Sequence, residues 1–207
     1  MNPIGWPKRL TAWACPTQSS PPWPRRPVRW RRLRLRRHHR RRARRSPGAR
    51  VEVLIPDCKG DAGALAVVFA ARPDVLAHNI ETVPRLQRAV RPSASYARSL
   101  SVLARAKAAG LVTKSSLIVG LGEEADEVGA TLADLAGVGL DIVTVGQYLR
   151  PTTHHLPVAR WWTPDEFAHV GALGRRLGIG RVVASPLTRP SYHARQAAAG
   201  LTPTPVA

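Results

Sequence analysis

The chain has 207 residues, enough for one domain with a sizeable core, and 44% of them are hydrophobic. Its formal net charge is +19, from 32 Lys and Arg against 13 Asp and Glu. The first 50 positions hold 16 of the basic residues and none of the acidic ones, which leaves 16 basic against 13 acidic, a net +3, for the other 157. The overall charge therefore does not mark the globular part as a nucleic-acid-binding domain.

The two cysteines, Cys15 and Cys58, are too few for a four-cysteine metal site or a disulfide framework. No apolar run reaches the roughly 18–20 residues of a membrane span. The beginning of the chain also lacks the apolar stretch of a secretory signal. It is Arg-rich and acid-poor like a mitochondrial presequence, but seven prolines before residue 28 oppose the amphipathic helix that such a presequence needs. We expect a cytoplasmic protein without a membrane partner.

Residues 1–46 follow neither the helical nor the strand period. Tryptophans lie among prolines and arginines, and ten of the residues 31–45 are arginine, so we predict a disordered segment. Three interpretations compete: an arm that binds nucleic-acid phosphates, a solvated tail, or GC-rich DNA translated in a wrong frame. We favour the third, because Arg, Pro and Trp codons are GC-rich. The first is the alternative function, and it predicts an affinity for nucleic acid that falls steeply with salt.

From about residue 46 to the end of the chain, strand-like apolar runs alternate with helical segments. This alternation is typical of βα units around a parallel sheet, so we predict an α/β fold for residues 47–207. The predicted strands are 51–56, 75–80, 113–121, 140–149 and 181–185, and the predicted helices are 61–71, 94–109, 123–136 and 164–177.

Polar residues follow four successive predicted strands. The carboxyl ends of parallel strands meet at one edge, where βα proteins place their chemistry, so the pattern indicates one shared site. Strand ends that simply meet water would give the same pattern, and both interpretations stay open. The residues are Asp57 and Lys59; His78, Asn79 and Glu81; Gly120, Gly122 and Glu123; Gln147 and Arg150.

Six blocks in these segments resemble lipoyl synthases, a family of radical S-adenosylmethionine (SAM) enzymes, in order and spacing. The resemblance covers about residues 46–195 and implies a truncated, partial (β/α) barrel of the radical SAM type. The blocks are VEVLIPDCKGD (51–61), PDVLAHNIETVPRLQRAVRP (73–92), YARSL (96–100), KAAGLVTKSSLIVGLGEEADEV (107–128), DIVTVGQYLRPTTHHLPVARWWTPDEF (141–167) and RPSYHAR (189–195).

The resemblance implies the insertion of two sulfur atoms, at C6 and C8 of an octanoyl chain on a lysine of a carrier domain. The implied cofactors are SAM and two [4Fe–4S] clusters, since no side-chain base can deprotonate an alkane. The implied partners are the carrier domains of dehydrogenase-complex E2 proteins and the glycine cleavage H protein.

The same resemblance implies roles for individual residues. Asn79 and Glu81 would hydrogen-bond SAM, although strand-end capping is their structural alternative. The other implied SAM-site residues are Gly120, Gly122 and Glu123 in the turn that approaches the adenosine, Gln147 beside the adenine, and Lys114 and Arg150 for an anionic partner such as a carboxylate.

The cluster ligands depart from the family pattern. In the family, a serine of the motif R-S-S-Y binds an iron of the auxiliary cluster, and here the motif reads Arg189-Pro190-Ser191-Tyr192. If the first serine is the ligand, Pro190 replaces it; if the second serine is the ligand, Ser191 keeps it, and both alternatives stay open. Both cysteine motifs of the family are missing, and Cys58 stands where the family has an apolar aromatic residue, so we expect it to pack in the core. We therefore expect this chain to be inactive as written, unless it completes a barrel with a separate partner fragment.

Overall fold

The computed structural model describes residues 50–189, so the predicted disorder of residues 1–46 and the proposed ligand Ser191 lie outside the described part. Five parallel strands form one sheet in the order β1-β2-β3-β4-β5, which confirms the predicted α/β class. The strands are β1 (Glu52–Leu54), β2 (Val75–Ala77), β3 (Thr113–Val119), β4 (Ile142–Gln147) and β5 (Arg181–Ala184).

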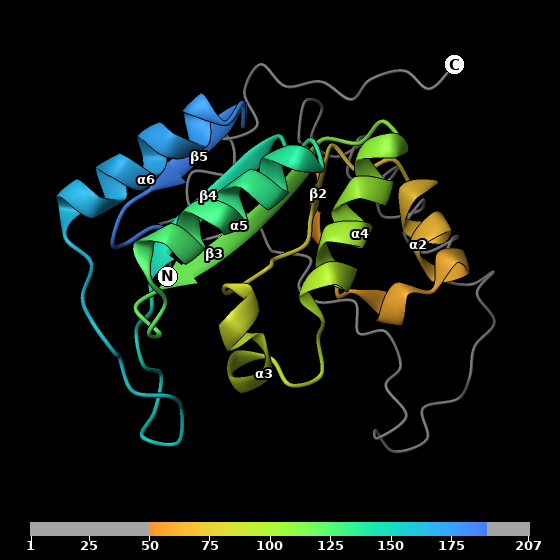
Figure 1. Cartoon of the computed structure of the whole chain (residues 1–207). Coiled ribbons are helices and arrows are strands. Elements are labelled where there is room, and N and C mark those ends of the chain that lie inside the picture. The colour runs from red at the N-terminus through yellow and green to blue at the C-terminus, as the bar shows by residue number, and fades with distance from the viewer. Residues whose placement is uncertain (1–49, 190–207) are drawn as a thin grey trace, which may run out of the picture.

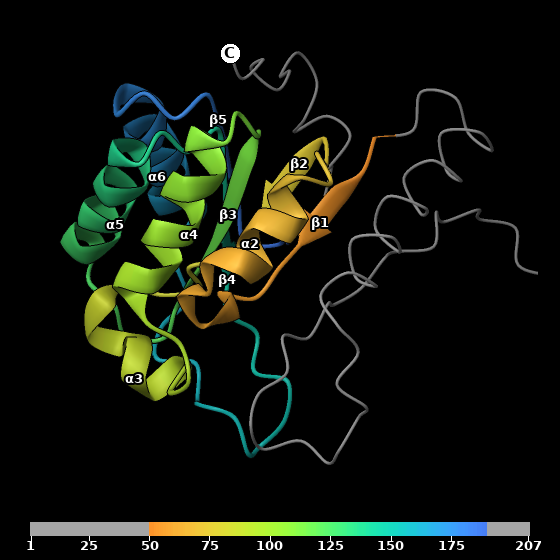
Figure 2. The ribbon, with the colours of Figure 1, turned by 90° about the vertical axis from the view of Figure 1, so that its right-hand side faces the viewer.

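Each connection between neighbouring strands contains a helix, and these helices cover the same face of the sheet (Figures 1 and 2). A parallel sheet with helices on one face only is the arrangement of a section of a (β/α) barrel, whose other face lines the interior. The helices are α2 (Ala62–Phe69), α4 (Tyr96–Ala108), α5 (Ala125–Gly137) and α6 (Pro164–Arg176).

The core lies between the sheet and these helices. Successive strand residues point to opposite faces, so alternate positions of β3 and β4 meet α5 and α6. Full burial of each such side chain contributes about 1.5–3 kcal/mol. The main cluster includes Leu117, Val119, Val143 and Val145 from the strands with Val128, Leu132, Phe167 and Val170 from the helices, and a second cluster joins Val51, Val53, Ile55, Leu65, Leu76 and Val102.

Predicted and observed helices agree except near their ends. The helix predicted from residue 123 begins at Ala125, because Glu123 turns its carboxylate back to the amides of Gly120 and Leu121 and Glu124 is the N-cap, whose carboxylate accepts from the amide of Glu127. In α6, Thr163 and Glu166 cap each other reciprocally and Pro164 occupies the first turn. Three short helices were not predicted because they are too short to show a 3.6-residue period: η1 (Cys58–Gly60), η2 (Pro84–Leu86) and α3 (Gln87–Val90).

Lys114, which the resemblance implies for an anionic partner, lies away from the strand ends. It is the second residue of β3, its side chain is 1% exposed, and its Nζ lies 3.0 Å from both carboxylate oxygens of Glu52 on β1. The carboxylate that it binds thus belongs to the protein itself.

We predict that Glu52→Gln lowers the free energy of unfolding by roughly 2–4 kcal/mol, because it leaves a buried ammonium without its counter-charge. The double variant Glu52→Leu/Lys114→Met removes both charges and should unfold close to wild type in urea. Lys107→Ala is the matched control, since the Lys107–Asp141 pair is more exposed and its loss should cost about 1 kcal/mol or less. Equal effects of Glu52→Gln and the control would contradict this account.

Candidate functional site

The candidate site is the edge where β2, β3 and β4 end. Three segments gather there: the chain after β2, the turn between β3 and α5, and the last residue of β4 with the first residues of the β4–α6 connection. Both α3 and the β4–α6 connection extend beyond this edge (Figures 1 and 2). The three segments contain all the strand-end candidates except Asp57 and Lys59, which follow β1.

His78 anchors the segment after β2. Its Nδ1 lies 2.9 Å from the carbonyl oxygen of Ile55 and its Nε2 lies 3.0 Å from Oγ of Ser99 on α4. A carbonyl only accepts, so Nδ1 carries the proton and Nε2 accepts from the serine hydroxyl. Burial lowers the pKa of His78, so the ring stays neutral and joins β1, β2 and α4.

Asn79 and Glu81 lie together beyond His78. The Asn79 Nδ2 donates to Oε1 of Glu81 at 3.1 Å. Glu81 has φ of +68°, rare for a residue with a side chain, and its main chain still bonds to β3 through Ser116 and Ile118. This conformation replaces the last residues of the strand predicted for 75–80, and β2 ends at Ala77.

The Glu81 carboxyl is held in a partly buried position. Burial raises its pKa, and the bond from Asn79 and the charge of Arg91 oppose that shift. No residue in the range 50–189 donates a hydrogen bond to its second oxygen, Oε2. An acceptor with spare capacity at a strand end is suited to a ligand hydroxyl or amine.

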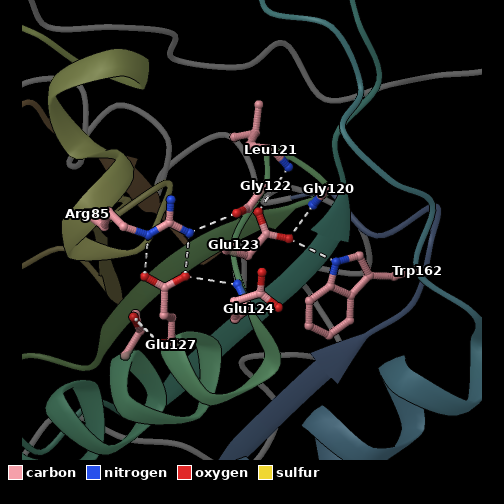
Figure 3. A network of polar contacts seen from close by, with 9 residues as sticks. Arg85, Gly120, Leu121, Gly122, Glu123, Glu124, Glu127 and Trp162 are labelled. Atoms are coloured by element: carbon pink, nitrogen blue, oxygen red, sulfur yellow. Dashed lines mark hydrogen bonds and ion pairs between the residues drawn. The ribbon is translucent and has the colours of Figure 1, made fainter.

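Glu123 is placed differently. It is 2% exposed, and both of its oxygens are used inside the protein (Figure 3). Its Oε1 accepts from the amide of Gly120 at 2.5 Å and from the indole Nε1 of Trp162 at 2.8 Å, and its Oε2 accepts from the amide of Leu121 at 2.9 Å. The side chain thus holds the β3–α5 turn in shape.

Gln147 also makes its bonds inside the protein. Its Oε1 accepts from the amide of Trp162 at 3.0 Å, and its Nε2 donates to the carbonyl of Arg160 at 3.1 Å. These bonds fix the returning half of the β4–α6 connection against Gly120. A β-carbon on Gly120 would lie 2.1 Å from Nε2 of Gln147, and its φ of +101° is a glycine conformation.

The remaining candidates are not drawn into this cluster. Arg150 is exposed, and its guanidinium donates to the carbonyls of His155 (2.9 Å) and Thr153 within its own loop. Gly122, with φ of +106°, presents its carbonyl to Arg85 at 2.8 Å (Figure 3). The cluster therefore consists of an Asn79–Glu81 pair and a Gly120–Glu123–Gln147 group in adjacent segments.

Sequence reasoning missed two residues that shape this edge. The amide of Trp162 donates to Gln147 and its indole N–H donates to Glu123. Arg85 binds the carbonyl of Gly122 on the other side of the β3–α5 turn. Neither has a periodic signal, because both lie in irregular connections. Both lie inside the blocks that resemble lipoyl synthases, and that position was the only sign in the sequence of a role at this site.

No group of three or more His, Cys, Asp or Glu side chains within residues 50–189 is arranged to hold a metal ion. Cys58 is buried in the cluster around β1, as expected for a packing residue. In the same range, no helix is both long and apolar enough to cross a membrane.

We predict that Gly120→Ala lowers the free energy of unfolding by roughly 2–4 kcal/mol, because the methyl group collides with Gln147 in a backbone conformation that alanine avoids. Gly137→Ala is the control: no atom lies within 4 Å of the place that a methyl group would take at this position of α5, so the change should be neutral or stabilise by up to about 1 kcal/mol. Urea denaturation measures both. A Gly120→Ala protein as stable as Gly137→Ala would refute the packing described here.

We predict that Glu81→Gln raises the free energy of unfolding near pH 7.5 and not near pH 4. The folded pKa lies above the ordinary 4.5, so ionisation costs stability at neutral pH, and the cost vanishes as pH falls through the folded pKa. Glu166→Gln should behave oppositely, because bonds from Thr163 and Arg160 lower the pKa of Glu166. Urea unfolding at the two pH values tests both signs, and a pH-independent effect of Glu81→Gln would show that burial does not disfavour its ionised form.

Comparison with known proteins places this chain in a family. A family model described as Radical SAM superfamily matches residues 20–135. Lipoyl synthases are similar over most of the chain: that of Leifsonia xyli subsp. xyli is 53% identical over 151 residues, 73% of this chain and 46% of the relative. That of Rubrobacter xylanophilus is 55% identical over 152 residues, which are 72% of this chain and 47% of the relative. The chain thus spans about half the length of these curated relatives.

A solved structure of the radical SAM methyltransferase TsrM from Kitasatospora setae, with cobalamin and a [4Fe–4S] cluster bound, aligns with a TM-score of 0.43 and 17% identity. The alignment covers 57% of this chain and 25% of that one, too slight a likeness to bear on function. The family model covers more than half of the sequence, and its match includes β1, β2, β3 and most of α5. This chain belongs to the radical SAM superfamily.

Proposed function

We propose that this chain is a portion of a lipoyl synthase, whose reaction inserts sulfur at C6 and C8 of a protein-bound octanoyl chain. The observation that carries the proposal is the identity of 53–55% with lipoyl synthases over about 150 residues. That stretch contains the three segments of the carboxyl edge described above. The partners would be the octanoylated carrier domains of E2 proteins and of the glycine cleavage H protein.

The residues of this edge fit the nucleoside part of SAM. Asn79 and Glu81 supply an amide and a carboxylate oxygen with spare bonding capacity, which suits ribose hydroxyls or the amino group of the methionyl part. Leu149, two residues beyond Gln147, is 43% exposed, and its apolar surface suits an aromatic base. These residues would hold and orient SAM, which would supply a 5′-deoxyadenosyl radical only in an enzyme whose [4Fe–4S] cluster gives it one electron.

The other candidates would act through this pair. In our proposal Gly120, Gly122, Glu123 and Gln147 are positioning residues, because their polar groups are used to shape the turn and the loop that frame the ligand. Lys114 has Glu52 as its internal carboxylate, whereas Arg150 has no carboxylate partner among residues 50–189 and keeps its charge for an anionic group.

The residues of this chain do not fit an iron–sulfur cluster. Such clusters need several thiolates, and the sequence has two cysteines, of which Cys58 is buried in the core. We therefore propose that the chain holds neither cluster and forms no lipoyl groups by itself. Ser191 remains a proposed ligand of the auxiliary cluster in an intact enzyme.

Titration calorimetry with S-adenosylhomocysteine, which needs no cluster, tests the nucleoside site. We expect the chain to bind, and Glu81→Ala to weaken binding by about tenfold, the equivalent of about 1.4 kcal/mol for a lost hydrogen bond to a charged group. Gly137→Ala, at the exposed C-terminal end of α5, should bind like wild type. Failure of the wild-type chain to bind, or equal affinity of the Glu81→Ala variant, would contradict the proposed site.

Anaerobic reconstitution with iron and sulfide separately tests the proposal that the chain holds neither iron–sulfur cluster. We expect no stoichiometric iron, whereas two [4Fe–4S] clusters would give about eight irons per chain. That higher number, with lipoyl groups formed on an octanoylated H protein, would overturn the proposed inactivity and leave the family assignment intact.

A further inference from the structure

Arg85 joins two segments of the site that are far apart in the sequence. It lies in η2, four residues after Glu81, and its Nε and one terminal nitrogen donate to the two oxygens of Glu127, each at 2.8 Å. The same terminal nitrogen donates to the carbonyl of Gly122 at 2.8 Å (Figure 3). One guanidinium thus contacts both the β3–α5 turn and the first turn of α5.

Glu127 extends this connection into the helix. It is the third residue of α5, and its Oε2 also accepts from the amide of Glu124 at 2.9 Å, completing a capping box. The bond from Arg85 is the main reason that the pKa of Glu127 falls to about 2, so the carboxylate stays ionised at every pH at which the protein is handled.

The β3–α5 turn is therefore fixed from two sides. On its inner side Glu123 binds the amides of Gly120 and Leu121, and on its outer side Arg85 binds the carbonyl of Gly122. Because Gly122 has a conformation open only to glycine, its own backbone does little to set the direction of that carbonyl.

We propose that Arg85 and Glu127 are positioning residues that hold the Asn79–Glu81 segment and the Gly120–Glu123 turn at a fixed separation, as two walls of one ligand site. The ligand part of this inference rests on the proposed function. An ordinary surface ion pair is the alternative, since the side chains of Arg85 and Glu127 are 54% and 26% exposed. The bidentate pairing and the additional bond to a backbone carbonyl favour a positioning role.

Hydrogen exchange followed by mass spectrometry tests the connection without any ligand. We expect Arg85→Ala to speed exchange of the amides in residues 120–124 by about fivefold or more, with little change in residues 142–147. Arg85→Lys keeps the charge but cannot bond both Glu127 oxygens and the Gly122 carbonyl, so its thermal midpoint should stay close to wild type while residues 120–124 still exchange fast. Lys107→Ala breaks a partly buried pair at the opposite edge and should leave the exchange of residues 120–124 unchanged.

Calorimetry with S-adenosylhomocysteine then tests the link to the site, and we expect Arg85→Ala to weaken binding by roughly threefold to tenfold. Unchanged exchange in Arg85→Ala, or full rescue by Arg85→Lys, would overturn the positioning role. Faster exchange with unchanged affinity would show that Arg85 holds the turn but does not position the ligand site. If the wild-type chain does not bind, the proposed function fails, and the exchange data alone decide whether Arg85 holds the turn.

Discussion

The structure of the carboxyl edge depends on one buried carboxylate. Glu123 accepts hydrogen bonds from two backbone amides and from the indole of Trp162, and so connects the β3–α5 turn to the far end of the β4–α6 connection. A buried carboxylate is stable only with such compensation, so its three donors must stay in place together. Gly120, Gln147 and Trp162 are then constrained by one another, and the loop after β4 returns across the end of β3.

This constraint separates two kinds of residue that look alike in the sequence. Asn79 and Glu123 are both polar, both follow a strand and both lie in blocks shared with lipoyl synthases. Glu123 has both oxygens occupied, whereas the Asn79–Glu81 pair keeps an oxygen that no described residue binds. A ligand can therefore bind the Asn79–Glu81 pair, whereas Glu123 determines the shape of the turn beside that ligand.

The fold was predictable because each βα unit repeats a simple pattern. Apolar runs and helical periods predicted all five strands and four helices near their observed positions, because the central strands are buried on both faces and the helices on one. The short helices η1, η2 and α3 were missed because one turn shows no period. The partners of Lys114 and Glu123 were missed because each bonds across strands or loops, 62 and 39 residues away in the chain. No local pattern encodes such a contact.

The central claim is that the ends of β2, β3 and β4 form one site for the nucleoside of SAM. Mapping amide chemical shifts by NMR during titration with S-adenosylhomocysteine tests it most directly. The account predicts shifts confined to residues 79–82, 120–122 and 147–149, with none at the opposite edge around residues 139–141. Shifts centred elsewhere, or no saturable shifts at all, would contradict it.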